Sequence, residues 1–534
     1  MIHCWLQEMY RKIYPVGNKP AGAFLRLDAA RNESTAFQVA VVNTALAVAK
    51  VKIAVKVPRG IDARIRRVGF VPLPHHNTDV PVDELDCRGH VPGYVPDPLF
   101  DEDDAQVAPR EAAGFWISVR TAADCRPGPH KLIIVVKPEG CQARKLLVRL
   151  QVYPLVLEPR RHFPVIQWFY NDALLDWYHF QPFEDGFWKI LERYLRDLPA
   201  HGQDTVLVPL CTPPTDGVKR PTQLLRVTTA GKRYRFDWRD VKRYVALARR
   251  CGLCHLEWNH FFSQWGAQYA IRVYCDQGRE EKLLWNPETP ATAPVYRNFL
   301  RQLLPELHQF LIREKLLKDS FFHVSDEPHT PEHKRNYKVA RAVLRELAPW
   351  MKTMDALSEI AYGREKLTDM PIPHIGVTKQ FYEEGIKSFT YFCCGPRGRY
   401  LNRLIDTPLI KIRMSGWLFY RFKALGFLHW GYNYWYKSQT RTLIDPFTES
   451  AGQWCHRGWA YGDPFLVYPG AEGPVDSIRW EIFSLSLQDY ALLQTAGIDP
   501  EGPFLARLRD FNDFPKDLRW FQAARKKLLA GQAR

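Results

Sequence analysis

Residues 320–328 read SFFHVSDEP, and the nearby residues 333–347 read HKRNYKVARAVLREL. The first stretch is a short apolar run that ends in two acids and a proline, whereas the second repeats apolar residues at helical spacing. Such a pair predicts a buried strand followed by an amphipathic helix. When this unit recurs along a chain, it favours a parallel sheet covered by helices.

The same unit recurs through residues 159–534. Earlier apolar runs precede amphipathic stretches, and the pairs are VIQWFY (165–170) with GFWKILERYLRDL (186–198), DTVLVPL (204–210) with DVKRYVALARRCG (240–252), and LCHLEWNHF (253–261) with VYRNFLRQLLPELHQFLIREK (295–315). Four later strand candidates are WMKTMDAL (350–357), HIGVTKQFY (374–382), SFTYFCC (388–394) and LGFLHWGYNYW (425–435). Eight strand candidates predict an α/β fold of the (β/α)8 TIM-like barrel type, with helices at 479–497 and 504–529 as the last barrel helix and an extension.

Residues 1–158 follow a different pattern. Short runs such as AFQVAVVN (36–43), GFWISVR (114–120) and HKLIIVVK (130–137) alternate apolar and polar positions, which is typical of an antiparallel β-sandwich. Residues 72–110 are dense in proline and acids, and we expect a long loop there. The sequence therefore predicts two domains, an N-terminal β-sandwich at 1–158 and a catalytic barrel with a C-terminal helical extension at 159–534.

Net charge and cysteine spacing indicate which partners and which compartment to expect. The chain has 534 residues, with 74 Lys and Arg against 58 Asp and Glu, a net charge of +16. The basic residues are scattered in short runs, and because affinity for a phosphate backbone needs clustered cations, we expect no nucleic-acid partner. The 11 cysteines have irregular spacing, which is typical of reduced thiols in the cytoplasm.

Neither a membrane segment nor a cofactor is predicted. No stretch reaches the roughly 18 consecutive apolar residues of a spanning helix, and no apolar signal segment precedes the first charges. The chain has no glycine-rich nucleotide motif. Cys251 and Cys254 form a lone pair without the further ligands that zinc requires, so we predict no metal site. The oligomeric state stays open.

Aromatic and amide side chains follow several of the predicted barrel strands. In a barrel the reacting groups lie at the carboxyl ends of the strands. Sugars stack their C–H faces on aromatic rings and need many hydrogen bonds for their hydroxyls. The expected sugar-binding residues are Trp168, Tyr170, Asn171, Trp258, Asn259, Tyr391, Trp430, Tyr432, Asn433 and Trp435. Any single one of them could instead be a core residue.

The fourth strand candidate alone ends in a tight pair of acids, Asp326 and Glu327. Glycosidases usually flank the scissile bond with two carboxyl groups, yet neighbours in a strand point to opposite faces unless the strand ends and turns there. Pro328 makes such an end plausible. The seventh strand candidate, 388–394, has no acid, and Glu383 and Glu384 look solvated. A nucleophile from the substrate remains, namely the carbonyl oxygen of a 2-acetamido sugar.

At this point the sequence resembles glycoside hydrolase family 123, whose barrel carries the domain of unknown function 4091. The resemblance rests on RNESTAFQVAVVN (31–43), HVSDEP (323–328), GFLHWGYNYW (426–435) and the late block YGDPFLVYPG (461–470) with GPVDSIRWEIFSLSLQDYALL (473–493). It implies a β-sandwich, a catalytic barrel and a retaining exo-β-N-acetylgalactosaminidase. It also implies Glu327 as the general acid/base, Asp326 as the partner of the acetamido group, and 430–435 as a sugar-contacting segment.

The resulting prediction is a retaining exo-glycoside hydrolase that releases a terminal β-linked N-acetylhexosamine, with N-acetylgalactosamine as the expected sugar. The reaction would pass through an oxazolinium intermediate, and the partner would be an oligosaccharide or glycoconjugate. One alternative is a barrel glycosidase on a non-acetylated sugar, with a second carboxylate from Glu257, Asp355 or Glu383. Another is a carbohydrate-binding protein without catalysis.

Overall fold

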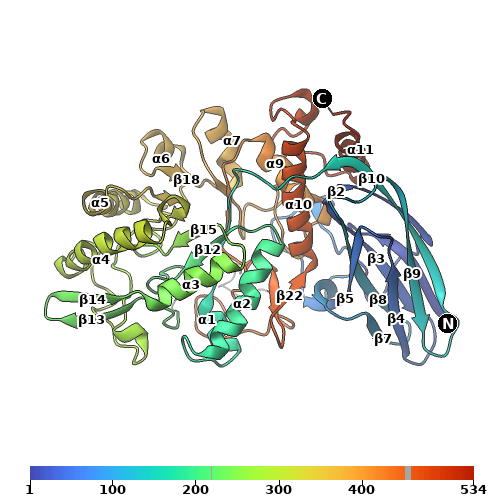
Figure 1. Cartoon of the computed structure of the whole chain (residues 1–534), viewed down its shortest axis with the longest axis horizontal. Coiled ribbons are helices and arrows are strands. Elements are labelled where there is room, and N and C mark those ends of the chain that lie inside the picture. Colours follow the sequence, from blue (N-terminus) through green and yellow to red (C-terminus); the bar gives the residue numbers. More distant parts are fainter. Residues whose placement is uncertain (218, 451–458, 534) are drawn as a thin grey trace.

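The computed structural model of the protein describes residues 1–217, 219–450 and 459–533. Two β-sheets gather the N-terminal strands on one side of the molecule, and a smaller parallel sheet ringed by helices forms the other side (Figure 1). Helix α10 (Ile478–Thr495) lies between the two sides in this view. No helix in the described ranges combines the length and the hydropathy needed to cross a bilayer.

The N-terminal region is mainly antiparallel, as the alternating pattern predicts. One sheet has seven strands, in the order β1 (Ile2–Glu8), β3 (Ser34–Asn43), β8 (Ala112–Thr121), β5 (Ile61–Leu73), β6 (Gly93–Phe100), β22 (Pro474–Ser477) and β21 (Val467–Pro469). The other has five, in the order β2 (Phe24–Arg31), β10 (Arg144–Val156), β9 (Gly128–Pro138), β4 (Ala49–Lys56) and β7 (Asp104–Val107). Only the β10–β2 pairing is parallel among these described strands.

A hydrophobic core fills the space between these two sheets. Phe37 and Phe115 of the first sheet and Val136 and Val148 of the second have no exposed surface. The prediction of a long loop at 72–110 is wrong, because this stretch contains the strands β6 and β7. Two prolines of this stretch, Pro96 and Pro98, lie in β6. They are tolerated because β22 pairs only with Pro98 and Leu99, so most of this edge of β6 needs no backbone N–H donors.

The late hairpin β21–β22 belongs in space to the N-terminal sheet. Asp476 and Ser477 of β22 pair with Leu99 and Pro98 of β6. A large apolar core joins the two sides of the molecule, because buried residues from both, such as Trp116 and Trp480, belong to the same cluster. The division of the chain at 158 and 159 therefore stays a prediction.

The second side is a mixed α/β region built on short parallel strands. Its main sheet has the order β16 (Ser320–Phe321), β15 (His255–Trp258), β12 (Thr205–Val208), β11 (Val165–Gln167), β20 (Phe427–His429) and β19 (Thr390–Tyr391). All five pairings in it are parallel. A separate parallel pair consists of β17 (Met354–Asp355) and β18 (Met370–Pro371).

Helices cover this parallel sheet and alternate with its strands. They are α1 (Asn171–Trp177), α2 (Asp185–Ala200), α3 (Arg239–Arg250), α4 (Pro294–Arg313), α5 (Pro331–Leu347), α6 (Ile360–Arg364), α7 (Ile375–Glu383), α8 (Leu409–Arg413), α9 (Ser415–Arg421) and α10. The last helix, α11 (Leu518–Leu529), instead contacts β2 and β10 of the N-terminal region. A hairpin of β13 (Arg226–Ala230) and β14 (Arg233–Asp237) interrupts the loop after β12.

The sixth strand candidate, 374–382, is wrong. These residues form α7, and the strand at this point of the order is the preceding β18. The His374 side chain accepts the backbone N–H of Gly376 and so caps the helix. Ile375, Thr378 and Phe381 are its buried residues. Their spacing of three residues is helical, which the apolar run concealed.

Candidate active site

A cavity of about 240 Å³ lies at the carboxyl ends of the parallel strands. Trp168 follows β11, Asp326 and Glu327 follow β16, and Trp430 follows β20, whereas Tyr391 is the last residue of β19. Fifteen residues line the cavity, and the others are Asp216, Gln264, Trp265, His329, Ala356, Cys393, Cys394, Leu428, Gln439 and Trp459. It combines aromatic rings with three carboxyl groups.

The backbone at Glu327 explains how two adjacent acids line one cavity. Glu327 has a φ of 39°, in the left-handed region that residues with a Cβ rarely adopt. The extended alternation of side chains therefore stops at this residue, and both carboxyl groups line the same space. A strained backbone of this kind is typical of functional sites and needs support from its surroundings.

That support comes from β17. Asp355 Oδ1 accepts the backbone N–H groups of Val324 at 3.0 Å and Ser325 at 3.2 Å. The Asp326 carbonyl oxygen in turn accepts the backbone N–H of Trp265 at 2.9 Å. The segment that leads into the acidic pair is thus fixed from both sides.

Asp326 is 5% exposed, and its carboxyl oxygen Oδ2 accepts a hydrogen bond from Gln264 Nε2 at 2.9 Å. Burial, reinforced by the charges of Glu327 and Asp216, holds the pKa of Asp326 well above its usual value. The Gln264 hydrogen bond works in the opposite direction because it favours the ionised carboxylate. Asp326 is therefore a carboxyl group whose charge depends on its partners.

Glu327 is more accessible than Asp326, with 28% of its side chain exposed. Its Oε1 accepts a hydrogen bond from the Tyr391 hydroxyl. Burial and the Glu327 charge hold the pKa of Tyr391 well above its usual value, so this tyrosine acts as a donor. On the other side, His329 Nε2 lies 3.9 Å from Glu327 Oε2. A partly exposed carboxyl group of this kind can exchange a proton with a ligand in the cavity.

Asp216 is the third acid in the cavity, and the sequence reasoning missed it. Its Oδ2 accepts the Tyr170 hydroxyl at 2.6 Å, and its backbone N–H donates to Gln264 Oε1 at 2.9 Å. Gln264 thus connects the Asp216 backbone to the Asp326 carboxylate. Burial raises the pKa of Asp216, and the nearby Lys219 opposes that shift. The signal was present, since Asp216 lies in the turn-forming PPTDG that follows the strand candidate at 204–210.

A buried polar network lies beneath the cavity. His323 Nε2 is 2.7 Å from Glu257 Oε1, and the same oxygen accepts Trp168 Nε1–H at 2.9 Å. His323 Nδ1 lies 3.6 Å from Asp355 Oδ1. Burial opposes the charged imidazolium, but Glu257 and Asp355 outweigh it and raise the pKa of His323 to about 10. This network holds the Trp168 ring and the strand segment below Asp326.

His260, His323 and Asp355 are close enough to suggest a metal cluster, with their ligand atoms within 4.8 Å of one another. Asp355 is nevertheless already engaged, because Oδ1 accepts two backbone N–H groups and Oδ2 accepts the Tyr337 hydroxyl. A second group, Asp197, His201 and Asp476, consists of ion-paired residues far along the chain from the acidic pair. Internal contacts thus account for Asp355 and for the second group, whereas both ring nitrogens of the buried His260 have no hydrogen-bond partner among the described residues.

Of the ten expected sugar-binding residues, Trp168, Tyr391 and Trp430 line the cavity. Trp430 is fixed by its indole N–H, which donates to Asp463 Oδ2 at 2.9 Å, and burial raises the pKa of Asp463 to about 7. Tyr170 reaches the cavity only through its hydrogen bond to Asp216.

The other six lie outside the lining and make internal contacts. Trp258 Nε1 donates to Ser320 Oγ, Tyr432 donates to Asp197, and Trp435 donates to the Val467 carbonyl. Asn259 accepts the Cys211 backbone N–H, and Asn433 forms hydrogen bonds with the Tyr170 backbone. Asn171 is the first residue of α1 and is 4% exposed. Strand-end position alone does not separate the two groups, because consecutive residues there alternate between the cavity and the packed interior. These six are not carried into the proposed sugar site.

The carboxylates considered for a two-acid mechanism also lie outside the cavity lining. Glu257 and Asp355 are fully buried in the network below it. Glu383 is exposed at the end of α7, and the neighbouring Glu384 pairs with Arg364. Among the described residues that line the cavity, the acids are Asp216, Asp326 and Glu327.

Comparison with known proteins identifies the family of this chain. The family model for the glycoside hydrolase 123 catalytic domain matches residues 168–496. No curated protein matches the sequence. Among solved structures, a family 123 glycoside hydrolase from Clostridium perfringens, described for its hydrolysis of glycolipid glycans, superposes with a TM-score of 0.75 at 13% identity, covering 95% of this chain and 91% of that one.

A family 5 xyloglucanase from Bacteroides ovatus is far less similar, with a TM-score of 0.34 at 9% identity over 91% of this chain and 99% of that one. The family model covers more than half of the chain and includes every described residue that lines the cavity. The chain is a glycoside hydrolase and belongs to glycoside hydrolase family 123.

Proposed function

We propose that the protein is a retaining exo-glycoside hydrolase that releases a terminal β-linked N-acetylhexosamine, N-acetylgalactosamine first among them, by substrate-assisted catalysis. The observation that carries the proposal is the pair Asp326 and Glu327 on one cavity wall, turned inward by the left-handed backbone at Glu327. Family membership disfavours the alternative of a binding protein without catalysis.

In the proposed mechanism, Glu327 in its protonated form gives its proton to the glycosidic oxygen as the bond to the anomeric carbon breaks. The acetamido carbonyl oxygen of the same sugar attacks that carbon and forms an oxazolinium ring. Glu327, now ionised, then takes a proton from the water that opens the ring. Its partial exposure and its hydrogen bond from Tyr391 suit a group that must work in both directions.

Asp326 is proposed to accept the acetamido N–H and to stabilise the positive charge that develops on the ring nitrogen. Its burial makes such a charge interaction strong, because few water molecules screen it. Trp168 and Trp430 would supply the aromatic walls against which the sugar ring packs.

The substrate is proposed to be the non-reducing end of an oligosaccharide or glycoconjugate. Glycolipid glycans are a candidate class because the Clostridium perfringens neighbour is described with them. The ten described cysteines are unpaired, which favours the reducing cytoplasm as the proposed location.

The proposed scaffold is a closed (β/α)8 barrel at 159–534 behind a β-sandwich domain at 1–158. Two isolated parallel bridges support closure. Phe322 pairs with Thr353 and would link β16 to β17, and His374 pairs with Tyr391 and would link the end of β18 to β19. With these bridges every parallel strand has two neighbours, and the carboxyl ends surround one opening.

Glu327→Gln tests the acid role. We expect hydrolysis of substrates with poor leaving groups to fall about 10²- to 10⁴-fold, because the proton donor is lost. Activated aryl glycosides need less protonation and should lose much less in the bond-breaking step. Steady-state rates on both substrate types provide the measurement. Glu384→Gln is the matched control, and an equal loss in that variant would contradict the assignment.

Asp326→Asn tests substrate assistance. We expect a loss of about 10²-fold or more in kcat on aryl β-N-acetylgalactosaminides, because the oxazolinium loses its counter-charge. A thiazoline mimic of the intermediate should inhibit the wild-type protein and bind Asp326→Asn much more weakly. Unchanged turnover in this variant, or indifference of the wild type to the thiazoline, would remove Asp326 from the proposed role.

Asp216 supports a second candidate, a glycosidase in which this carboxylate is the nucleophile and no acetamido group is needed. Its position on the cavity wall favours the idea, and the hydrogen bond that it accepts from Tyr170 favours the ionised carboxylate, whereas burial raises its pKa and disfavours an ionised nucleophile. Azide rescue of Asp216→Ala with a glycosyl azide product of inverted configuration would support it. Activity restricted to 2-acetamido sugars would support substrate assistance instead.

A further inference from the structure

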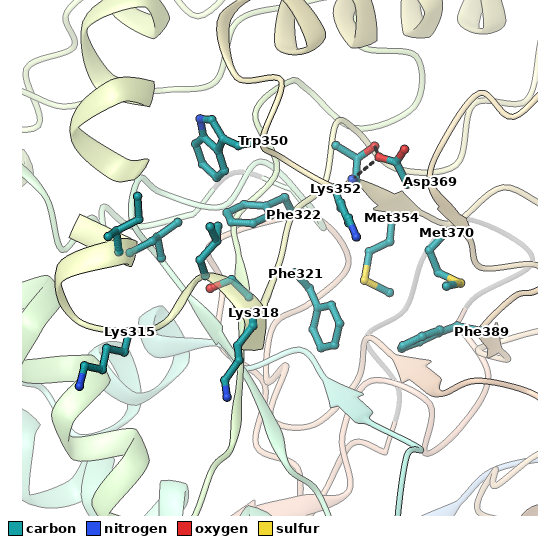
Figure 2. A pocket seen from close by; sticks show the side chains of 15 residues that line it. Lys315, Lys318, Phe321, Phe322, Trp350, Lys352, Met354, Asp369, Met370 and Phe389 are labelled. Atoms are coloured by element: carbon teal, nitrogen blue, oxygen red, sulfur yellow. Dashed lines mark hydrogen bonds between the residues drawn. The ribbon is translucent and has the colours of Figure 1, made fainter. Parts of the chain in front are cut away.

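A larger cavity, of about 690 Å³, lies at the opposite ends of the same parallel strands (Figure 2). Phe321 belongs to β16, Met354 begins β17, Met370 begins β18, and Phe389 directly precedes β19. The active-site residues follow these strands or end them. The two cavities therefore open at opposite ends of the barrel region, and nothing in the proposed hydrolysis uses the larger one.

The walls of this cavity are apolar. The rings of Phe321 and Phe389 meet edge to face with centroids 5.9 Å apart, and Phe322 meets Trp350 in the same way at 5.5 Å. Figure 2 shows the two methionine side chains, Met354 and Met370, above Phe389 on one side, and Trp350 beside Phe322 on the other. A cavity of this size and character falls in the range that binds small molecules.

Three lysines border the apolar walls, namely Lys315, Lys318 and Lys352. All three are exposed, and none has an ion pair with another described residue. Asp369 is the one acid of the lining, and Arg341 already pairs with it at 2.6 Å. The border therefore carries uncompensated positive charge next to a hydrophobic interior.

Few polar groups inside the cavity are free to serve a peptide backbone. Ser320 Oγ accepts Trp258 Nε1–H and donates to the Leu316 carbonyl. Thr353 Oγ1 contacts Asp369 and Thr368. A buried peptide group would lose its hydrogen bonds to water without replacement, whereas an alkyl chain loses none.

We propose that this cavity binds a single-chain anionic amphiphile, a long-chain carboxylate, with its alkyl chain against Phe321, Phe322 and Phe389 and its head group among the lysines. Charge complementarity selects the anionic head, and the apolar walls select the chain. The ligand site is independent of the hydrolase site, so either proposal can fail without the other.

Calorimetric titration of the whole chain with octanoate, decanoate and dodecanoate, each below its micelle concentration, tests the proposal. We expect one site per chain, with affinity rising about fourfold for each added methylene because every methylene is removed from water. The affinity should fall as salt is added, since the lysines are exposed. The alcohol of the same chain length should bind at least tenfold more weakly.

Two variants assign the binding to this cavity. The triple change Lys315→Gln, Lys318→Gln, Lys352→Gln should weaken dodecanoate at least tenfold at low ionic strength. Met370→Trp should fill the space and weaken all chain lengths. The matched control changes three exposed lysines elsewhere, Lys145→Gln, Lys189→Gln, Lys232→Gln, and should bind as the wild type does.

Circular dichroism and the thermal midpoint of each variant show whether it is folded. The proposal is overturned if the folded lysine variant binds like the control, if the alcohol binds as tightly as the carboxylate, or if no carboxylate binds the wild type at millimolar concentration. Binding of an acidic peptide in preference to the carboxylates would likewise overturn it.

Discussion

At the scale of single residues, the site depends on one unusual backbone conformation. Glu327 adopts a φ of 39°, which costs of the order of 1–3 kcal/mol for a residue with a side chain. Because of this conformation both Asp326 and Glu327 line the cavity, whereas a regular strand end would direct only one of two adjacent side chains into it. The hydrogen bonds from Val324 and Ser325 to Asp355 hold the chain on the approach to this residue.

Gln264 provides a test of the electrostatics at this scale. Its hydrogen bond favours ionised Asp326, whose pKa burial and the neighbouring acids already hold well above the usual value. Gln264→Leu should raise that pKa further. If ionised Asp326 is required, the acidic limb of kcat/KM, where activity falls as the pH drops, moves to higher pH by about one unit.

Gln439→Leu is the control for that experiment, because Gln439 lines the same cavity and makes no hydrogen bond to Asp326. We expect its acidic limb to stay in place. If the acidic limb moves equally in both variants, or in neither, ionisation of Asp326 does not set the pH dependence of kcat/KM.

At the scale of elements, helix α10 fixes the mixed α/β region to the N-terminal sheet. Arg479 near its start contacts Asp97 of β6 at 2.9 Å, and Arg66 of β5 contacts Asp476 of β22 at 2.6 Å. Ser477, the last residue of β22, caps the helix by accepting the backbone N–H of Trp480 at 3.1 Å. The strand, the cap and the helix therefore form one connected unit.

Ser477→Ala should destabilise the protein by about 1 kcal/mol, because the first turn of α10 loses its cap. Urea unfolding measures the change in the free energy of unfolding. Ser484→Ala, within the same helix, is the control and should lose little, since alanine favours helices. Equal effects of the two changes would contradict the capping role.

At the scale of the whole molecule, a buried group of charges lies where the two sides meet. His201, directly after α2, faces Asp197 at 2.9 Å and Glu481 of α10 at 3.3 Å, with Asp476 at 3.7 Å. Arg66 from the N-terminal sheet contacts both Asp476 and Glu481. Burial opposes a charged His201, but Asp197 and Asp476 outweigh it and hold its pKa well above the usual value.

His201→Gln tests this junction through its pH dependence. A histidine whose pKa is raised on folding adds stability that is complete below its unfolded pKa of about 6.5 and is lost as the pH rises through the folded pKa. The variant should therefore be less stable than the wild type by about 3 kcal/mol at pH 6, with a smaller difference at higher pH. Chemical unfolding at several pH values measures it, and a difference independent of pH would contradict the argument.

The recurrence of short apolar runs and amphipathic stretches was enough to predict the mixed α/β region and most of its strands, because burial patterns are local in the sequence, whereas the family was predicted from the resemblance of particular motifs such as HVSDEP (323–328). Strand-end position led to the acidic pair after β16 and to Trp168, Tyr391 and Trp430, all of which line the cavity, while their roles stay predictions. Residues such as Trp258 and Trp435 could not be separated from them, since neighbouring positions differ only in which way they face.

Other features belong to the tertiary structure. Asp216 comes to the cavity from a loop more than a hundred residues before Glu327, and Gln264 joins it to Asp326. The hairpin β21–β22 adds to a sheet whose other strands lie in the first 121 residues. The chemical types and the local periods of the chain determined the elements and the position of the acidic pair at a strand end. Contacts between distant segments decided which groups surround that pair, because hydrogen bonds and packing across the fold leave no trace in local sequence order.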